Sequence, residues 1–74
     1  MRPYIMDIKM IEIGAKYKHF KGNEYEVVAI AKHSETLEDM VVYRKLYGDR
    51  ETWVRPATMW SDIKEGVPRF QKVK

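Results

Sequence analysis

The hydrophobic positions of this chain form short runs separated by polar turn signals, a pattern typical of a β protein. A run rich in Val, Ile and Ala over residues 24–33 predicts a long strand, and a run over residues 40–47 predicts a second. Weaker runs predict three more short strands, over residues 17–20, 50–55 and 69–73. Turn signals lie between these runs, at Lys21-Gly22-Asn23, Gly48-Asp49 and Gly66.

Two turn signals sharpen this interpretation. Gly48-Asp49 has glycine in first place, as a type II′ hairpin turn requires, so it predicts a tight connection between residues 40–47 and 50–55. Pro56 ends the second of these strands, and residues 58–63 fit one helical turn. Short strands with turns every 8–12 residues indicate a sandwich or barrel. We therefore predict a mostly β fold, a small antiparallel SH3-like barrel with one short helical turn.

The 74 residues leave room for one domain. Residues 1–13 fit helical spacing and broken strand alternation equally well, and Gly14 closes this segment. We predict an N-terminal extension over residues 1–13, whose secondary structure the pattern does not decide, and a single β domain over residues 14–74.

Register predicts which side chains share a face. A tight Gly48-Asp49 turn pairs Arg44 with Trp53 and Val42 with Arg55, and a six-residue loop pairs His33 with Met40. One predicted face is the core, with Val28, Ile30, Val41, Tyr43 and Val54. The other places Arg44 and Arg55 beside Trp53, which we expect to serve as a core anchor as well, with His33 at the rim. Arg donors and an indole plate suit an anionic or planar ligand. The candidate ligand-binding residues are Arg44, Trp53, Arg55, His33 and Tyr43.

Composition limits the chemistry. There is no cysteine, which excludes disulfides and Cys-based zinc sites and fits a cytoplasmic protein. Two Trp, five Tyr and two Phe must therefore supply most of the core. No apolar stretch is long enough for a membrane span, and the N-terminus is not a signal peptide. The net charge of +3 permits an anionic partner without requiring one.

No catalytic or metal-binding motif is recognised. His33-Ser34-Glu35 are neighbours along the chain, whereas a catalytic triad converges in space, so we expect Ser34 and Thr36 to cap the loop instead. His19 and His33 are the only histidines, and neither belongs to a metal-binding pattern. We predict no catalytic residue, no metal and no cofactor.

From Gly14 onward the chain resembles a bacterial family, domain of unknown function 1653, over about 60 of its 74 residues. The residues that carry the resemblance are Tyr17-Lys18-His19-Phe20-Lys21-Gly22-Asn23-Glu24-Tyr25-Glu26-Val27, Ala31-Lys32-His33-Ser34-Glu35-Thr36, Val42-Tyr43, Leu46-Tyr47-Gly48-Asp49, Trp53-Val54-Arg55-Pro56, Met59-Trp60 and Pro68-Arg69-Phe70. Trp60 stands where a Phe is usual, and residues 1–13 fall outside the pattern. The resemblance implies a small intracellular β domain and implies no activity.

Three classes of function follow. We favour a binding module without chemistry of its own, for nucleic acid or another anionic planar ligand. Small barrels commonly offer aromatic and basic residues to single strands. The second class is a protein-interaction or accessory domain that accepts a partner strand at a sheet edge. The third is a very small enzyme that uses His19 and His33. The oligomeric state and the identity of the ligand stay open.

Overall fold

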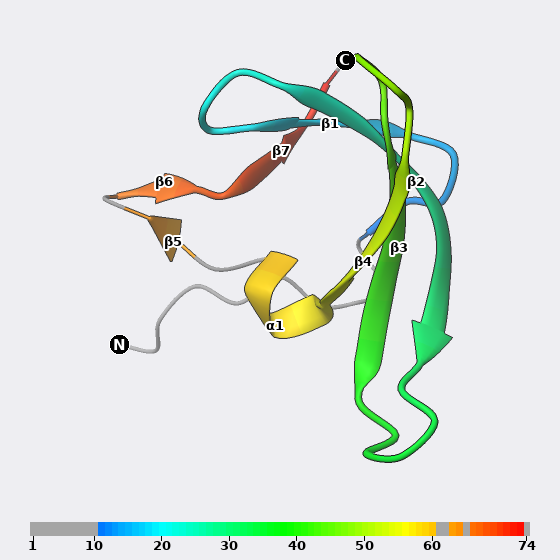
Figure 1. Cartoon of the computed structure of the whole chain (residues 1–74). Helices are drawn as coiled ribbons and strands as arrows, with labels where there is room; N and C mark the ends of the chain where they lie inside the picture. Colours follow the sequence, from blue (N-terminus) through cyan, green and yellow to red (C-terminus); the bar gives the residue numbers. More distant parts are fainter. Residues whose placement is uncertain (1–10, 61–62, 65, 74) are drawn as a thin grey trace.

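The computed structural model of the chain describes residues 11–60, 63–64 and 66–73. Within them lie seven strands and one short helix (Figure 1). In chain order the elements are β1 (Lys16–His19), β2 (Glu24–Lys32), β3 (Asp39–Lys45), β4 (Thr52–Pro56), α1 (Ala57–Trp60), β5 (Ile63–Lys64), β6 (Val67–Pro68) and β7 (Phe70–Lys72). The strands and the helical turn expected from the sequence are all present, which confirms the mostly β class. The open question of residues 1–13 concerns mainly residues 1–10, which lie outside the described residues.

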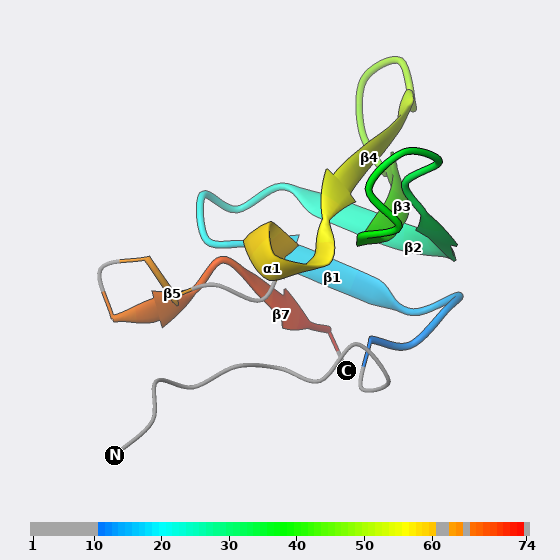
Figure 2. The same ribbon diagram turned by 90° about the horizontal axis from the view of Figure 1, so that it is seen from below.

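The main sheet is antiparallel, with the order β4-β3-β2-β1-β7, and β5 pairs with β6 in a separate two-stranded sheet. The long strand β2 joins the two halves of the main sheet. Its start pairs with β1, and Tyr25 to Lys32 pair with β3. Figures 1 and 2 show the sheet curving round at β2, with α1 on its inner side. The strands β4 and β7 stay unpaired to each other at the two edges, so the predicted barrel exists only as a curved, open sheet.

A β-bulge in β2 changes the predicted faces. Val27 pairs with Tyr43 and Ala29 pairs with Val42, so Val28 is the extra residue between them. Beyond it, Ala31 pairs with Met40, whereas the predicted loop paired Ala31 with Val42. A bulge moves later side chains to the opposite face. Val27 is therefore buried in the core while Val28 is only half-buried, which reverses the prediction for these two residues.

The hairpin between β3 and β4 also differs from its predicted register. The turn itself is where we expected it, because the Arg50 N–H donates to the Tyr47 carbonyl at 3.1 Å and Gly48 has a φ of 59°. The ladder then resumes one residue out of step, and Lys45 donates to the carbonyl of Glu51. Leu46 is the extra residue, and its N–H donates to Glu24 of β2 instead.

This shift pairs Tyr43 with Trp53, and Arg44 with Thr52. The predicted Arg44–Trp53 pair was wrong, because one extra residue turns every later side chain of β4 to the other face. Val54 was expected in the core and is 56% exposed. We call the face of β3 that carries Tyr43 the inner face and the face that carries Arg44 the outer face.

The core lies between the inner face and α1. Its buried side chains are Ile11, Tyr17, Val27, Val41, Tyr43, Trp60 and Phe70. The indole of Trp60 stacks on the ring of Phe70 with centroids 3.7 Å apart and planes 4° apart. The predicted core anchor Trp53 is 51% exposed, whereas Trp60 is fully buried. The aromatic anchor of this small core therefore comes from the helical turn and not from β4.

The connection between β2 and β3 is held by local hydrogen bonds. Thr36 Oγ1 accepts from the Glu38 N–H at 3.2 Å, as expected of a loop cap. His33 contributes a second cap, because its Nδ1 accepts from the N–H groups of Glu35 and Thr36 at 3.1 and 3.3 Å. The histidine therefore has a structural role in this loop.

Candidate ligand-binding site

The inner face carries a small cavity of about 130 Å³ near the β3–β4 hairpin. Strand alternation explains its lining, because residues two apart on β3 and β4 point to the same face. We call it the aromatic cavity. Its lining residues are His19, Tyr25, Tyr43, Lys45, Tyr47, Trp53, Arg55 and Phe70. They come from all five strands of the main sheet and from the hairpin that follows β3.

Phe70 forms the floor of the aromatic cavity. It is buried, and the rings of Tyr25, Tyr43 and His19 pack against it edge to face, with centroids 5.7, 5.9 and 5.0 Å away. Tyr25 extends this wall outward to Tyr47, with which its hydroxyl shares a hydrogen bond of 2.9 Å. Edge-to-face contacts between rings stabilise this arrangement. The cavity wall is therefore continuous with the core.

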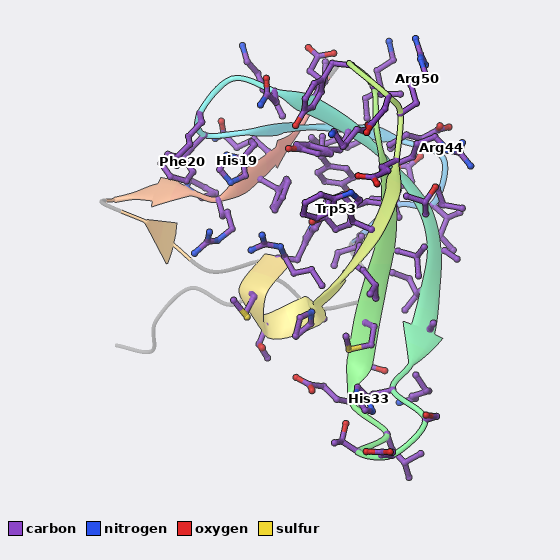
Figure 3. The ribbon with its side chains drawn as sticks, in the orientation of Figure 1. His19, Phe20, His33, Arg44, Arg50 and Trp53 are labelled. Atoms are coloured by element: carbon purple, nitrogen blue, oxygen red, sulfur yellow. The ribbon has the colours of Figure 1, made fainter. Side chains whose placement is uncertain are left out.

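Trp53 lines the cavity and remains half exposed to solvent. Its indole Nε1 donates to Glu51 Oε1 at 3.0 Å, which fixes the orientation of the ring. Figure 3 shows the side chain on the same side of the sheet as α1. A half-exposed, oriented indole is a flat surface on which a second ring can stack.

Two cationic side chains line the cavity, and none of its lining residues is acidic. Lys45 Nζ lies 5.0 Å from the ring centroid of Tyr47 and 5.8 Å from that of Trp53. The guanidinium of Arg55 lies 5.7 Å from the centroid of Phe70, and its Nη1 donates to the carbonyl of Met59 at 3.4 Å. The aromatic faces thus already hold cations that belong to the protein, which disfavours a cationic ligand and favours an anion.

Asp49 lies just outside the lining and pairs with Lys45, Nζ to Oδ1, at 3.1 Å. The hydrogen bond with Asp49 raises the pKa of Lys45 above 10.5. The same bond lowers the pKa of Asp49 below 3.8, so both groups are charged at neutral pH. An anion that enters the cavity therefore competes with Asp49 for Lys45.

The pKa of Tyr25, on the cavity wall, is also shifted. Burial first, and then the hydrogen bond with Tyr47, raise the pKa of Tyr25 to about 12. Tyr25 is therefore a neutral hydroxyl at any physiological pH and adds no negative charge to the wall.

The structure brings together three of the five candidate residues. Tyr43, Trp53 and Arg55 line the aromatic cavity. Arg44 lies on the outer face, where its Nη1 is 3.7 Å from Glu26 Oε1, and His33 lies at the far end of the β2–β3 hairpin (Figure 3). The expected surface with Arg44 beside Trp53 does not form, because Leu46 displaces the register.

The sequence interpretation missed five lining residues, namely His19, Tyr25, Lys45, Tyr47 and Phe70. One signal was available, since Tyr43, Lys45 and Tyr47 alternate at the strand period and so share a face. The other three reach the cavity from β1, β2 and β7, and only the curvature of the sheet brings them there.

Two further features of the described residues bear on function. Among residues 11–60, 63–64 and 66–73, no group of three or more His, Asp or Glu side chains is placed to hold a metal ion. In the same part of the chain, α1 falls far short of the length and apolar character of a membrane-crossing helix.

Comparisons with known proteins agree with the architecture. A family model described as "Protein of unknown function (DUF1653)" matches residues 15–72. A crystal structure of a protein belonging to DUF1653 from Bordetella bronchiseptica is similar to this chain, with 29% sequence identity and a TM-score of 0.80. The similarity covers 90% of this chain and 92% of that one. No curated protein matches the sequence. The resemblance seen in the sequence is thereby confirmed.

Proposed function

We propose that this chain, which belongs to the DUF1653 family of proteins of unknown function, is a binding module whose aromatic cavity takes a planar, negatively charged ligand. Single-stranded nucleic acid is the ligand class we favour. The observation that carries the proposal is the half-exposed indole of Trp53 beside two cations, Lys45 and Arg55, in a cavity with no acidic lining residue.

The size of the cavity supports a single ring as the bound group. Its volume of about 130 Å³ is close to the roughly 150 Å³ of an apolar cavity that accepts benzene. It is well below the roughly 300 Å³ at which pockets for drug-sized ligands begin. A nucleobase stacked on Trp53 fits this size, and its phosphate then lies within reach of Lys45 or Arg55, both of which donate to phosphate oxygens.

Two features of the chain support a non-catalytic module in the cytoplasm. The cavity offers rings and cations, and the hydroxyl of Tyr25 stays protonated because its pKa is raised to about 12. The sequence contains no cysteine and so does not depend on disulfides, which fits a reducing compartment.

The test is a titration with a fluorescently labelled oligothymidylate. We expect Trp53→Ala to weaken binding by about 1–3 kcal/mol, the value of one base stacked on an aromatic ring. We expect Arg55→Ala to weaken binding as well, through the lost phosphate contact. The matched control is Arg44→Ala, which removes the same charge from the outer face and should bind like the parent.

Thermal melts of all three variants show whether a loss of binding reflects unfolding. Equal losses for Arg44→Ala and Arg55→Ala would mean that general charge, and not the cavity, attracts the strand. Unchanged binding in Trp53→Ala would sink the proposed site.

A further inference from the structure

A row of aromatic rings leads out of the aromatic cavity onto the loop between β1 and β2. The His19 ring packs against Phe70 at the cavity floor, with centroids 5.0 Å apart, and then against Phe20, with centroids 4.6 Å apart and planes tilted by 33°. Phe20 is 37% exposed. Figure 3 shows His19 and Phe20 next to each other at the end of β1, apart from Trp53.

We propose that this row extends the binding surface, so that the domain holds two neighbouring bases of a single strand, one in the aromatic cavity against Trp53 and the next on Phe20. This inference rests on the proposed function and specifies its ligand as a polynucleotide and not a mononucleotide.

The backbone that carries the Phe20 ring is held by several hydrogen bonds. The Phe20 N–H donates to the carbonyl of Arg69 at 2.9 Å, which ties the loop to the segment before β7. His19 closes the loop three times: its N–H donates to Asn23, its carbonyl accepts from Gly22 at 2.7 Å, and its Nδ1 accepts from the Lys21 N–H at 3.1 Å. Gly22 has a φ of 108°, which L side chains rarely adopt. A preorganised ring binds more tightly because little conformational entropy is lost on binding.

The charge beside Phe20 repeats the arrangement in the cavity. Lys21 Nζ lies 6.0 Å from the Phe20 ring centroid, as Lys45 Nζ lies 5.8 Å from that of Trp53. Each exposed ring therefore has a cation next to it. A single strand presents bases and phosphates in the same alternation, and aromatic rings with adjacent cations are how proteins bind it without sequence preference.

The experiment compares four thymidine ligands with the full chain: the mononucleotide, the dinucleotide, and two dinucleotides in which one or the other base is replaced by an abasic sugar. For the parent protein we expect the complete dinucleotide to bind about 5- to 150-fold more tightly than the mononucleotide, the gain from one stacked base. The abasic analogues keep the phosphates and should lose most of this gain.

Variants of Phe20 assign the gain to that ring. Phe20→Leu keeps an apolar side chain but cannot stack, so it should bind the mononucleotide like the parent and lose the gain from the second base. Phe20→Tyr keeps the ring and should retain the gain, which guards against a variant that merely disturbs His19. Trp53→Ala should weaken both ligands.

The outcomes separate the two proposals. If the mononucleotide binds and depends on Trp53, but Phe20→Leu keeps the full gain, the extension is overturned and the proposed function stands. If abasic and complete dinucleotides bind alike, phosphate charge explains the gain and the second base site is refuted. If neither the mononucleotide nor the dinucleotide binds, both proposals fail together.

Discussion

At the scale of single residues, Tyr25 has the clearest electrostatic signature in the cavity wall. Burial and the hydrogen bond with Tyr47 raise its pKa from 10.0 to about 12. Because the folded value is the higher one, the stabilising contribution is fully present below pH 10.0 and is lost as the pH rises through about 12. Alkaline solution should therefore weaken the fold through this tyrosine.

We predict that Tyr47→Phe lowers the pKa of Tyr25 toward 10.0 without reaching it. The variant removes the shared hydrogen bond of 2.9 Å, while burial, the larger cause of the shift, remains. Ultraviolet titration of tyrosinate absorbance measures the change. The control is Tyr25→Phe, in which the absorbance step at the highest pH should disappear. Persistence of that step in Tyr25→Phe would assign it to a different tyrosine.

The two tryptophans should differ sharply in their effect on stability. Trp60 is fully buried between Tyr17, Tyr43 and Phe70, so Trp60→Ala should reduce the free energy of unfolding by about 3–5 kcal/mol. Trp53 is half exposed, and Trp53→Ala should reduce it by about 1 kcal/mol or less. Urea unfolding of the two variants measures both values, and similar losses would contradict the assignment of the core anchor to α1.

A third variant, Trp60→Phe, tests the packing of this anchor. The buried Nε1 of Trp60 has no hydrogen-bond partner among residues 11–60, 63–64 and 66–73. An unpaired buried donor costs about 1–3 kcal/mol. A phenylalanine at position 60 removes this N–H donor and still places a ring against Phe70. We expect the relief to offset part of the lost contact area, so that Trp60→Phe is destabilised by less than about 2 kcal/mol.

At the scale of elements, the sequence predicted the strands well and their faces poorly. Apolar runs and glycine turns located β1 to β4, the helical turn and β7 within a few residues. The faces failed at Val28 and Leu46, the two residues that interrupt the ladders. Val28 lies within an apolar run and Leu46 stands next to Tyr47. Alternation cannot show which of two adjacent apolar residues is the extra one.

These irregularities also explain how much of the site was predictable. Trp53 and Arg55 are two apart on one strand, so their shared face follows from the strand period alone. Their expected neighbour Arg44 lies across the displaced hairpin, and that relation depended on register. Residues from β1 and β7 reach the cavity through curvature of the sheet, which has no local sequence signal.

The β3–β4 hairpin gives a prediction at this scale. Gly48 and Arg50 both have left-handed φ angles, of 59° and 57°. A side chain in this conformation costs roughly 1–2 kcal/mol. An added Cβ at Gly48 meets no atom within 4 Å, so no clash adds to this cost, and Gly48→Ala should destabilise the domain by about 1–2 kcal/mol. Arg50→Gly should instead stabilise it by up to about 1 kcal/mol, after the added freedom of the unfolded chain is counted. Urea unfolding measures both, and equal destabilisation would refute the strain at Arg50.

At the scale of the whole molecule, ion pairs with carboxylates offset several of the positive charges. Carboxylates outside the cavity neutralise nearby cations in several pairs, among them Asp39 with Lys32 at 2.7 Å and Glu12 with Lys72. The net charge is only +3, from 14 basic and 11 acidic residues.

Binding of an anion should therefore depend on the few cations of the aromatic cavity and not on a general basic field. If two or three phosphates are contacted, the logarithm of the affinity should fall with the logarithm of the salt concentration with a slope of roughly −1.4 to −2.

Asp49 pairs with Lys45 at the edge of the aromatic cavity, and its removal should strengthen anion binding. Asp49 holds Lys45 at 3.1 Å, and Asn at this position keeps an oxygen for the Glu51 N–H while it gives up the charge. Because exposed ion pairs are individually weak, Asp49→Asn should raise the affinity for oligothymidylate by no more than about fivefold and make its salt dependence steeper. The matched control is Asp39→Asn, which releases Lys32 at the far end of the β2–β3 hairpin and changes the net charge equally. Anisotropy titrations at several salt concentrations measure both variants. If the two substitutions raise the affinity by the same factor, net charge alone attracts the strand, and Lys45 does not bind the phosphate.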